Sequence, residues 1–117
     1  MKIKGFGGVF WRTKNINDLK KWYSEVLGIS MENEWNGTII QTDKGNETIF
    51  SFFNEDSDYF PTEQPVMLNF QVENMEQCLL HLEKLGIPLL KETEKSEFGI
   101  FNWIADPDGR WIELWEK

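Results

Sequence analysis

A single carboxylate near the C-terminus stands between two tryptophans. The stretch WIELWE (111–116) alternates in character, so Trp111, Glu113 and Trp115 share one face of a predicted strand, and Ile112 and Leu114 share the other. A carboxylate on an aromatic face suits three roles: a structural ion pair, a general base whose pKa is raised by desolvation, or an anchor for a cationic ligand. Glu113 is therefore the first candidate for chemistry.

Composition and charge limit the kinds of partner that Glu113 can bind. The chain has 117 residues, 40% hydrophobic and 27% charged, which predicts one folded globular domain. A formal charge of −8 argues against binding to nucleic acid or to an anionic membrane. Acidity serves solubility, and it also favours a cationic ligand. Six tryptophans and nine phenylalanines exceed the need of a small core and indicate an aromatic binding surface, with large core fillers as the alternative.

The cysteine count and the N-terminal stretch bear on the compartment. A single cysteine, Cys78, excludes an internal disulfide and fits a reducing environment. The first residues, MKIKGFGGVFWRTK, lack the apolar region of a signal peptide, and no apolar run is long enough to cross a bilayer. We therefore expect a cytoplasmic protein.

The elements that must position Glu113 occur twice along the chain. An acidic, proline-containing loop, NEDSDYFPTEQP (54–65), separates two similar halves of about 3–54 and 65–117. Each half contains a strand, a helix, the triplet LGI and three further strands. The predicted helices cover 16–27, capped by Asn15 or Asn17, and 75–85, capped by Asn74. The predicted strands are 7–13, 29–35, 37–43 and 47–53, then 66–72, 88–94, 99–105 and 110–116. The chain is thus a single α+β domain of two tandem βαβββ units.

Three segments resemble a known superfamily. GGVFWRTKNINDLKKWYSEVLGI, VMLNFQVENMEQCLLHLEKLGIP and FNWIADPDGRWIELWE resemble the vicinal oxygen chelate superfamily, which includes glyoxalase I, bleomycin-resistance proteins and extradiol dioxygenases. The resemblance implies a mixed sheet curled into a cup, with the helices outside. It also implies a divalent metal held by His, Gln or Glu on the first and last strands of each unit.

Most of these implied ligand positions hold side chains that cannot bind such a metal. The last-strand ligand falls on Glu113, but the others fall on Gly8, on Met67 and on Ile49 or Phe50. The one histidine, His81, lies on a predicted helix and should point away from the cup. We expect a metal-site-depleted member that needs no cofactor. The alternative is a divalent ion held by carboxylates alone, with Glu113 joined by Glu55 or Asp56.

Strand alternation predicts the lining of the cup. On each strand, the residues opposite the apolar, helix-facing set should line it. These are Phe10, Arg12, Met67, Asn69, Gln71, Phe101, Trp103, Trp111, Glu113 and Trp115. An aromatic concavity with a few polar groups is typical of a small-molecule site. The structural alternative is an ion pair between Arg12 and Glu113.

Three functions fit this surface. The favoured hypothesis is a metal-free protein that binds a small aromatic or cationic molecule, similar to the drug-binding groove of bleomycin-resistance proteins. The second is a lyase or isomerase of glyoxalase type, with Glu113 as base or metal ligand. The third is an interaction module whose aromatic residues face a protein partner. Whether the protein is an enzyme stays open, and the ligand is not identified.

Two further expectations concern partners and the connecting loop. Members of the resembling superfamily commonly form homodimers whose cup is completed across the subunit boundary, and we expect a homodimer here. Tyr59 and Phe60 on the loop either close over a ligand or anchor the loop, and anchoring is favoured.

Overall fold

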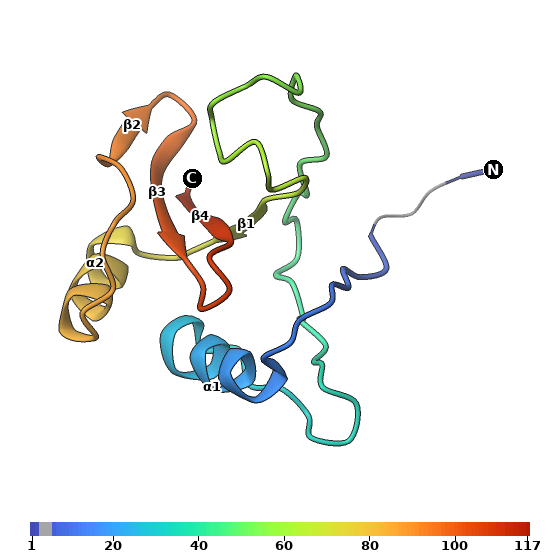
Figure 1. The fold of residues 1–117 in the computed structure, drawn as a ribbon. Coiled ribbons are helices and arrows are strands. Elements are labelled where there is room, and N and C mark those ends of the chain that lie inside the picture. Colours follow the sequence, from blue (N-terminus) through green and yellow to red (C-terminus); the bar gives the residue numbers. More distant parts are fainter. Residues whose placement is uncertain (3–5) are drawn as a thin grey trace.

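The fold is a mixed four-stranded sheet with two helices (Figure 1). This computed structural model describes residues 1–2 and 6–117. The elements are α1 (Ile16–Leu27), β1 (Leu68–Gln71), α2 (Met75–Lys84), β2 (Glu94–Ser96), β3 (Gly99–Ala105) and β4 (Trp111–Glu116). The strand order is β1-β4-β3-β2, with β1 parallel to β4 and the other pairs antiparallel. The predicted α+β class is confirmed, and the sheet is not closed into a barrel.

Both helices form where the sequence predicts them. α1 spans the predicted residues and ends at Gly28, whose φ of +69° is the left-handed conformation that glycine adopts readily. In α2 the Asn74 side chain accepts a hydrogen bond from the Gln77 backbone N–H at 3.1 Å. Asn15 occupies the N-cap position of α1, but its side chain makes no such bond. Among the described residues, neither helix is long and apolar enough to cross a membrane.

Both helices pack on one face of the sheet. Ile104, Ile112 and Leu114 form that face and are at most 3% exposed. They share one core cluster with Leu19, Tyr23 and Val26 of α1 and with Met75 and Leu82 of α2. The predicted helix-facing roles of Ile112 and Leu114 are confirmed. The aromatic face is therefore the opposite face of the sheet.

The prediction of strands in the first half is wrong for the described residues. In the described part of residues 6–54, the structure has α1 and one isolated bridge between Glu32 and Gly37, and no strand. The physical reason is that α1 packs on the C-terminal sheet, so no helix covers the predicted strands. Their apolar side chains are exposed, among them Ile39 at 75% and Phe52 at 90%. Residues 3–5 of the predicted first unit lie outside the described residues, and the division into units 3–54 and 65–117 stays a prediction.

The strand predicted over 88–94 is also shifted, since β2 covers Glu94–Ser96. Residues 87–93 have no strand assignment, although the Leu90 backbone N–H donates to the Trp103 carbonyl at 2.9 Å. The remaining strands of the second half, and their order around α2, agree with the prediction of a βαβββ unit.

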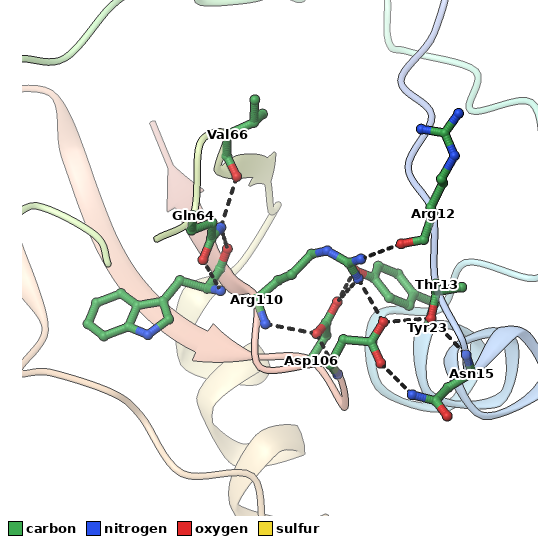
Figure 2. Close-up of polar contacts among 10 residues, drawn as sticks. Arg12, Thr13, Asn15, Tyr23, Gln64, Val66, Asp106 and Arg110 are labelled. Atoms are coloured by element: carbon green, nitrogen blue, oxygen red, sulfur yellow. Dashed lines mark hydrogen bonds and ion pairs between the residues drawn. The ribbon is translucent and has the colours of Figure 1, made fainter. Parts of the chain in front are cut away.

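The DPDG turn before β4 ties α1 to the sheet (Figure 2). Gly109, with a φ of +82°, closes the turn through its backbone N–H to the Asp106 carbonyl at 2.9 Å. The buried Asp106 accepts from the Tyr23 hydroxyl at 2.9 Å, and Arg110 pairs with Asp108 at 3.1 Å. Burial, and then the Asp106 carboxylate, raise the pKa of Tyr23. The Tyr23–Asp106 bond, with the bonds from Thr13 and Asn15 to Asp108, holds α1 and the segment before it against the C-terminal sheet.

Candidate functional site

The face of the sheet opposite the helices presents the residues predicted to share it. Glu113 lies directly across from Asn69 on β1 and from Trp103 on β3, and Phe101 lies across from Trp115. Directly paired residues project from the same face of a sheet. The predicted grouping of Asn69, Phe101, Trp103, Glu113 and Trp115 on one face is therefore confirmed. Their ligand-binding role remains a prediction.

Glu113 is buried and held by three hydrogen-bond donors. Its side chain belongs to a residue that is 6% exposed. Asn69 Nδ2 donates to Oε1 at 2.6 Å, whereas Trp103 Nε1 at 2.8 Å and the Tyr59 hydroxyl at 2.5 Å both donate to Oε2. Bonds to an ionised acceptor are about twice as strong as neutral ones. The carboxylate is therefore stabilised by hydrogen bonds.

The predicted ion pair between Arg12 and Glu113 is not formed. Arg110 makes both ion pairs of the described residues, with Asp106 and Asp108. Arg12 is exposed and contributes its backbone carbonyl to Arg110 Nη2 at 2.8 Å, while its side chain points away from that contact (Figure 2). With no strand over residues 7–13, nothing aims the Arg12 side chain at the sheet.

A row of aromatic rings surrounds Glu113. Phe101 lies nearly parallel to Trp115, with centroids 5.7 Å apart and an interplanar angle of 8°, and nearly parallel to Trp103 at 6.4 Å. Tyr59 meets Trp103 edge-on at 5.9 Å and stacks on Phe53 at 5.1 Å. The aromatic row thus consists of Trp115, Phe101, Trp103, Tyr59, Phe53 and Phe60. It is a run of neighbouring rings, and Trp103 and Tyr59 in its middle both donate to the Glu113 carboxylate.

Lys91 brings a positive charge to the same surface. Its Nζ lies 4.1 Å from the centroid of Trp103 and 4.4 Å from that of Tyr59. Such distances are those of cation–π interactions. The same Nζ donates to the Tyr59 backbone carbonyl at 3.3 Å. The position over these rings where a cationic ligand would be attracted is therefore occupied by the protein's own lysine.

The connecting loop covers this surface. Tyr59 comes from the loop 54–65 and reaches Glu113 across 54 residues of sequence. Burial, followed by the bond to Glu113, raises the pKa of Tyr59. Where the loop ends, the Gln64 side chain donates to the Trp111 carbonyl at 2.9 Å and accepts from the Trp111 backbone N–H at 2.8 Å (Figure 2). Trp103 is consequently 0% exposed, although we predicted that it lines an open cup.

The other residues predicted to line the cup lie away from Glu113 or at the edge of the sheet. Phe10 is 90% exposed and Gly8 is also exposed, because the segment that holds them forms no strand. Met67 is half-buried just before β1. Gln71 lies directly across from Trp115, so its predicted place on the face of Glu113 is confirmed. It is exposed, and its Nε2 donates to the Glu47 carbonyl at 3.0 Å, which brings the first half beside β1.

The donor set around Glu113 does not fit a divalent metal. Each carboxylate oxygen faces N–H or O–H donors, whereas a cation needs further oxygen or nitrogen acceptors. Among the described residues, no three His, Cys, Asp or Glu side chains gather at one place. His81 is exposed on α2, and its Nε2 is 3.0 Å from the Val26 carbonyl, as expected for a helix residue that faces away from the site. We therefore assign no metal-dependent chemistry to Glu113.

Two shallow cavities lie elsewhere on the molecule. One, of about 300 Å³, is lined by Pro61, Glu63, Gln64, Pro65, Asp108, Gly109 and Arg110, and the other, of about 400 Å³, by residues 13–18. Neither is lined by the aromatic row. With the loop in this position, the surface around Glu113 is a packed cluster of side chains.

Sequence analysis missed Lys91 and Phe53 as parts of this cluster. Lys91 was placed on a strand that forms later in the chain, and Phe53 on a strand that does not form. Tyr59 is predicted to anchor the loop, and its bond to Glu113 agrees with that prediction. The available signal was the aromatic pair YF inside an otherwise polar, acidic loop, since a loop without packing duties rarely needs large rings.

Comparison with known proteins supports the fold. A family model described as the glyoxalase/bleomycin resistance protein/dioxygenase superfamily matches residues 5–114. Among solved structures, a glyoxylase/bleomycin resistance protein/dioxygenase domain from Frankia sp. EAN1pec is 19% identical, with a TM-score of 0.59 and 98% of each chain covered. A search of curated proteins finds no match.

Two further solved structures of similar fold belong to proteins with different activities. A lactoylglutathione lyase from Agrobacterium tumefaciens is 17% identical, with a TM-score of 0.55 over 89% of this chain and 87% of that one. TnmS3, an antibiotic binding protein from Streptomyces sp. CB03234, is 20% identical, with a TM-score of 0.52 over 85% and 84%. At these identities the likeness shows the fold alone, which hosts both binding proteins and enzymes.

Proposed function

Because this chain belongs to the glyoxalase/bleomycin resistance protein/dioxygenase superfamily, we propose that it binds a small aromatic molecule, without a metal, on the aromatic face of its C-terminal sheet. One observation supports this most: a row of rings surrounds a buried carboxylate that hydrogen bonds hold in place. A site of this kind offers stacking for affinity and one polar group for orientation.

The Trp115 end of the row and the Glu113 carboxylate have different parts in this proposal. Phe101 and Trp115 are half-buried, so their parallel rings leave area free for a planar ligand. Favourable ring contacts contribute about 0.5–1.5 kcal/mol each beyond area burial. Glu113, whose oxygens are already oriented by Asn69 and Trp103, offers a fixed acceptor for a ligand's O–H or N–H group. We therefore favour a neutral aromatic ligand over a cationic one, since Lys91 already covers Trp103.

The direct test is ligand binding followed by tryptophan fluorescence, using a set of small aromatic compounds. Replacement of Trp115 by Leu should weaken binding about three- to tenfold, the loss expected for one stacking contact. Trp35→Leu is the matched control, because Trp35 is 53% exposed and lies in the first half of the chain. Equal losses in both variants would contradict the site. If no compound binds the folded protein, an interaction module becomes the better hypothesis.

We also propose that binding needs no metal. The three donors on Glu113 support this, because a cation at the same oxygens would have to displace them. Elemental analysis of protein purified without chelator, and then offered zinc, nickel, manganese and iron, should give no stoichiometric metal. One metal per chain that is lost on Glu113→Gln would reverse this proposal.

The second candidate is a lyase or isomerase of glyoxalase type with Glu113 as general base. Its burial at 6% exposure favours such a role. Against it, three of the carboxylate's roughly four acceptor positions are already used, which leaves little room to accept a proton from a substrate. Turnover of a hemithioacetal that is lost on Glu113→Gln, with the fold intact, would establish the enzyme. Binding without turnover would leave the binding protein.

A homodimer remains our proposal for the quaternary structure. Exposed apolar side chains in the first half support it, among them Phe10, Ile39 and Phe52, because a monomer rarely leaves so many uncovered. β1 is also an edge strand of the sheet. Size-exclusion chromatography with light scattering should give twice the chain mass, and a monomer at micromolar concentration would contradict the proposal.

A cytoplasmic location is likewise proposed. The single cysteine, half-buried on α2 and unpaired, supports a reducing compartment. Cell fractionation with an antibody against the protein would test the location.

A further inference from the structure

We infer that the Tyr59 side chain is an internal occupant of the ligand site, and that the ligand is a neutral hydroxylated aromatic molecule that displaces it. This inference rests on the proposed function, since it names the ligand class of that same surface and adds a competitor from the chain itself. It is built on the geometry of the Tyr59 ring.

Tyr59 makes the contacts that a bound phenol would make. Its hydroxyl donates to Glu113 Oε2 at 2.5 Å, and its ring forms a T-shaped pair with Trp103 and stacks on Phe53. Lys91 Nζ lies 4.4 Å from the ring centroid. The ring is therefore bound through one polar group, two aromatic neighbours and one cation, which together define a site of phenol size.

Hydrogen bonds join the loop that supplies Tyr59 to the sheet at two places, Tyr59 itself and Gln64 at the end of the loop. Between residues 54 and 63, the described hydrogen bonds to the sheet or to Lys91 are both made by Tyr59. The other bonds of this stretch are local, such as the Ser57 backbone N–H to the Asn54 carbonyl at 3.0 Å. Glu55, Asp56 and Asp58 are exposed. Once Tyr59 leaves, little else holds this part of the loop down.

The groups that would receive a ligand do not depend on Tyr59. Trp103 Nε1 and Asn69 Nδ2 still orient the Glu113 carboxylate when the tyrosine is absent, since they come from β3 and β1. The departing side chain leaves an acceptor position on Oε2 and the place beside Trp103 that the Tyr59 ring had occupied. A flat ring with one O–H donor satisfies both at once.

Charge selects among aromatic ligands. A cationic ring would approach Lys91, which already lies over Trp103 at 4.1 Å. An anionic ring would approach the Glu113 carboxylate and pass the acidic loop residues. A neutral phenol meets neither repulsion. The proposed ligand is therefore neutral, unlike the cationic ligand that the acidic sequence also favours.

Competition lowers the affinity by a defined factor. If the loop is open in about 1–10% of molecules, the apparent dissociation constant is about 10–100 times larger than that of the open site. Removal of the tyrosine ring should recover that factor. The expected effect is thus an increase in affinity on truncating a residue that lies in the site.

The test uses p-cresol, which is the side chain of tyrosine as a free molecule, with toluene as the probe that lacks the hydroxyl and benzylamine as the cationic probe. Affinities are measured by calorimetry for the wild type, Tyr59→Ala and Tyr59→Phe. Phe52→Ala is the matched control, because it removes an exposed ring that contacts Phe50. Circular dichroism checks that each variant is folded.

The expected result is that Tyr59→Ala binds p-cresol about 10–100-fold more tightly than the wild type and the Phe52→Ala control do, with Tyr59→Phe between them. Toluene and benzylamine should bind Tyr59→Ala at least about tenfold more weakly than p-cresol, because neither offers a neutral O–H donor to the buried carboxylate. If Tyr59→Ala does not fold, Tyr59→Phe is compared with the wild type instead, and tighter binding of p-cresol by Tyr59→Phe supports the inference.

Contrary results separate the two proposals. Equal p-cresol affinity in the wild type and the folded tyrosine variants overturns the internal occupant but leaves an aromatic site elsewhere on the face. Equal affinity for p-cresol and toluene overturns the ligand class. Aromatic compounds that bind the wild type and lose affinity on Trp115→Leu, without any effect of Tyr59, preserve the proposed function alone.

Discussion

Alkaline pH should destabilise this protein through its two tyrosines. Tyr23 and Tyr59 are the only tyrosines in the chain, and each donates its hydroxyl to a buried carboxylate, Asp106 or Glu113. Burial and the adjacent carboxylate raise the pKa of both phenols. In the unfolded chain each has a pKa of about 10. Above that pH the unfolded state loses protons that the folded state keeps.

The sign and size follow from proton linkage. Between the unfolded pKa and the raised folded pKa, the unfolded state binds fewer protons, so the free energy of unfolding falls by about 1.4 kcal/mol per pH unit per tyrosine. Tyr23 is 2% exposed and should contribute in full, about 2.7 kcal/mol between pH 10 and pH 12. Tyr59 can also ionise when its loop opens, which limits its contribution to the free energy of that opening. If the loop is open in about 1–10% of molecules, this contribution is about 1.4–2.7 kcal/mol. The sum of about 4–5 kcal/mol approaches the whole stability of a small domain, about 5–15 kcal/mol.

Two measurements check this prediction. Urea unfolding at a series of pH values gives the slope, and ultraviolet absorbance of the phenolate reports ionisation of these two residues. Tyr23→Phe and Tyr59→Phe each leave a single reporter, and the slope above pH 10 should be shallower in Tyr23→Phe. A native protein in which either tyrosine ionises near its unfolded pKa, without loss of structure, would refute the hydrogen-bonded geometry of that residue.

Four further substitutions test the packing of the site, two glycine positions and the cap of α2. Trp103→Phe keeps an aromatic ring but removes the N–H that donates to the buried Glu113 carboxylate. Urea unfolding should show that the free energy of unfolding falls by about 1–3 kcal/mol. An unchanged midpoint would show that this donor is dispensable. Gly99→Ala should cost about 3 kcal/mol or more, because φ is +128° and the new Cβ would lie 2.1 Å from the Glu116 carbonyl oxygen. Gly109→Ala, with positive φ but open space, should cost only about 1–2 kcal/mol, and equal losses would contradict the close approach. Asn74→Ala removes the cap of α2 and should lower the melting temperature by an amount equivalent to about 1 kcal/mol, whereas no change would mean that water replaces the cap.

Local spacing was enough to predict both helices and most strands of the second half. The helix over 16–27 and the strand over 99–105 begin and end where the pattern places them. The alternation in 111–116 correctly separates Glu113 from Ile112 and Leu114. Helical and strand periodicity depend on neighbours a few residues apart, which the sequence displays directly.

Which partners these elements meet was decided by the tertiary structure. The contacts that define the site join Tyr59 to Glu113 across 54 residues, and Tyr23 to Asp106 across 83. No periodic pattern records such pairs. The strands predicted in the first half are absent from the described residues for the same reason. Their alternation is present, but α1 packs on the C-terminal sheet, and a strand without a covered face gains little from pairing.

The sequence by itself therefore determined that this protein has an α+β fold with a carboxylate on an aromatic sheet face. The tertiary structure alone decided that this carboxylate is neither exposed nor ion-paired, but is capped by Trp103, Asn69 and a tyrosine from a distant loop. The physical reason is that the face of a side chain follows from backbone geometry one residue at a time, whereas its hydrogen-bond partners follow from where the whole chain can pack.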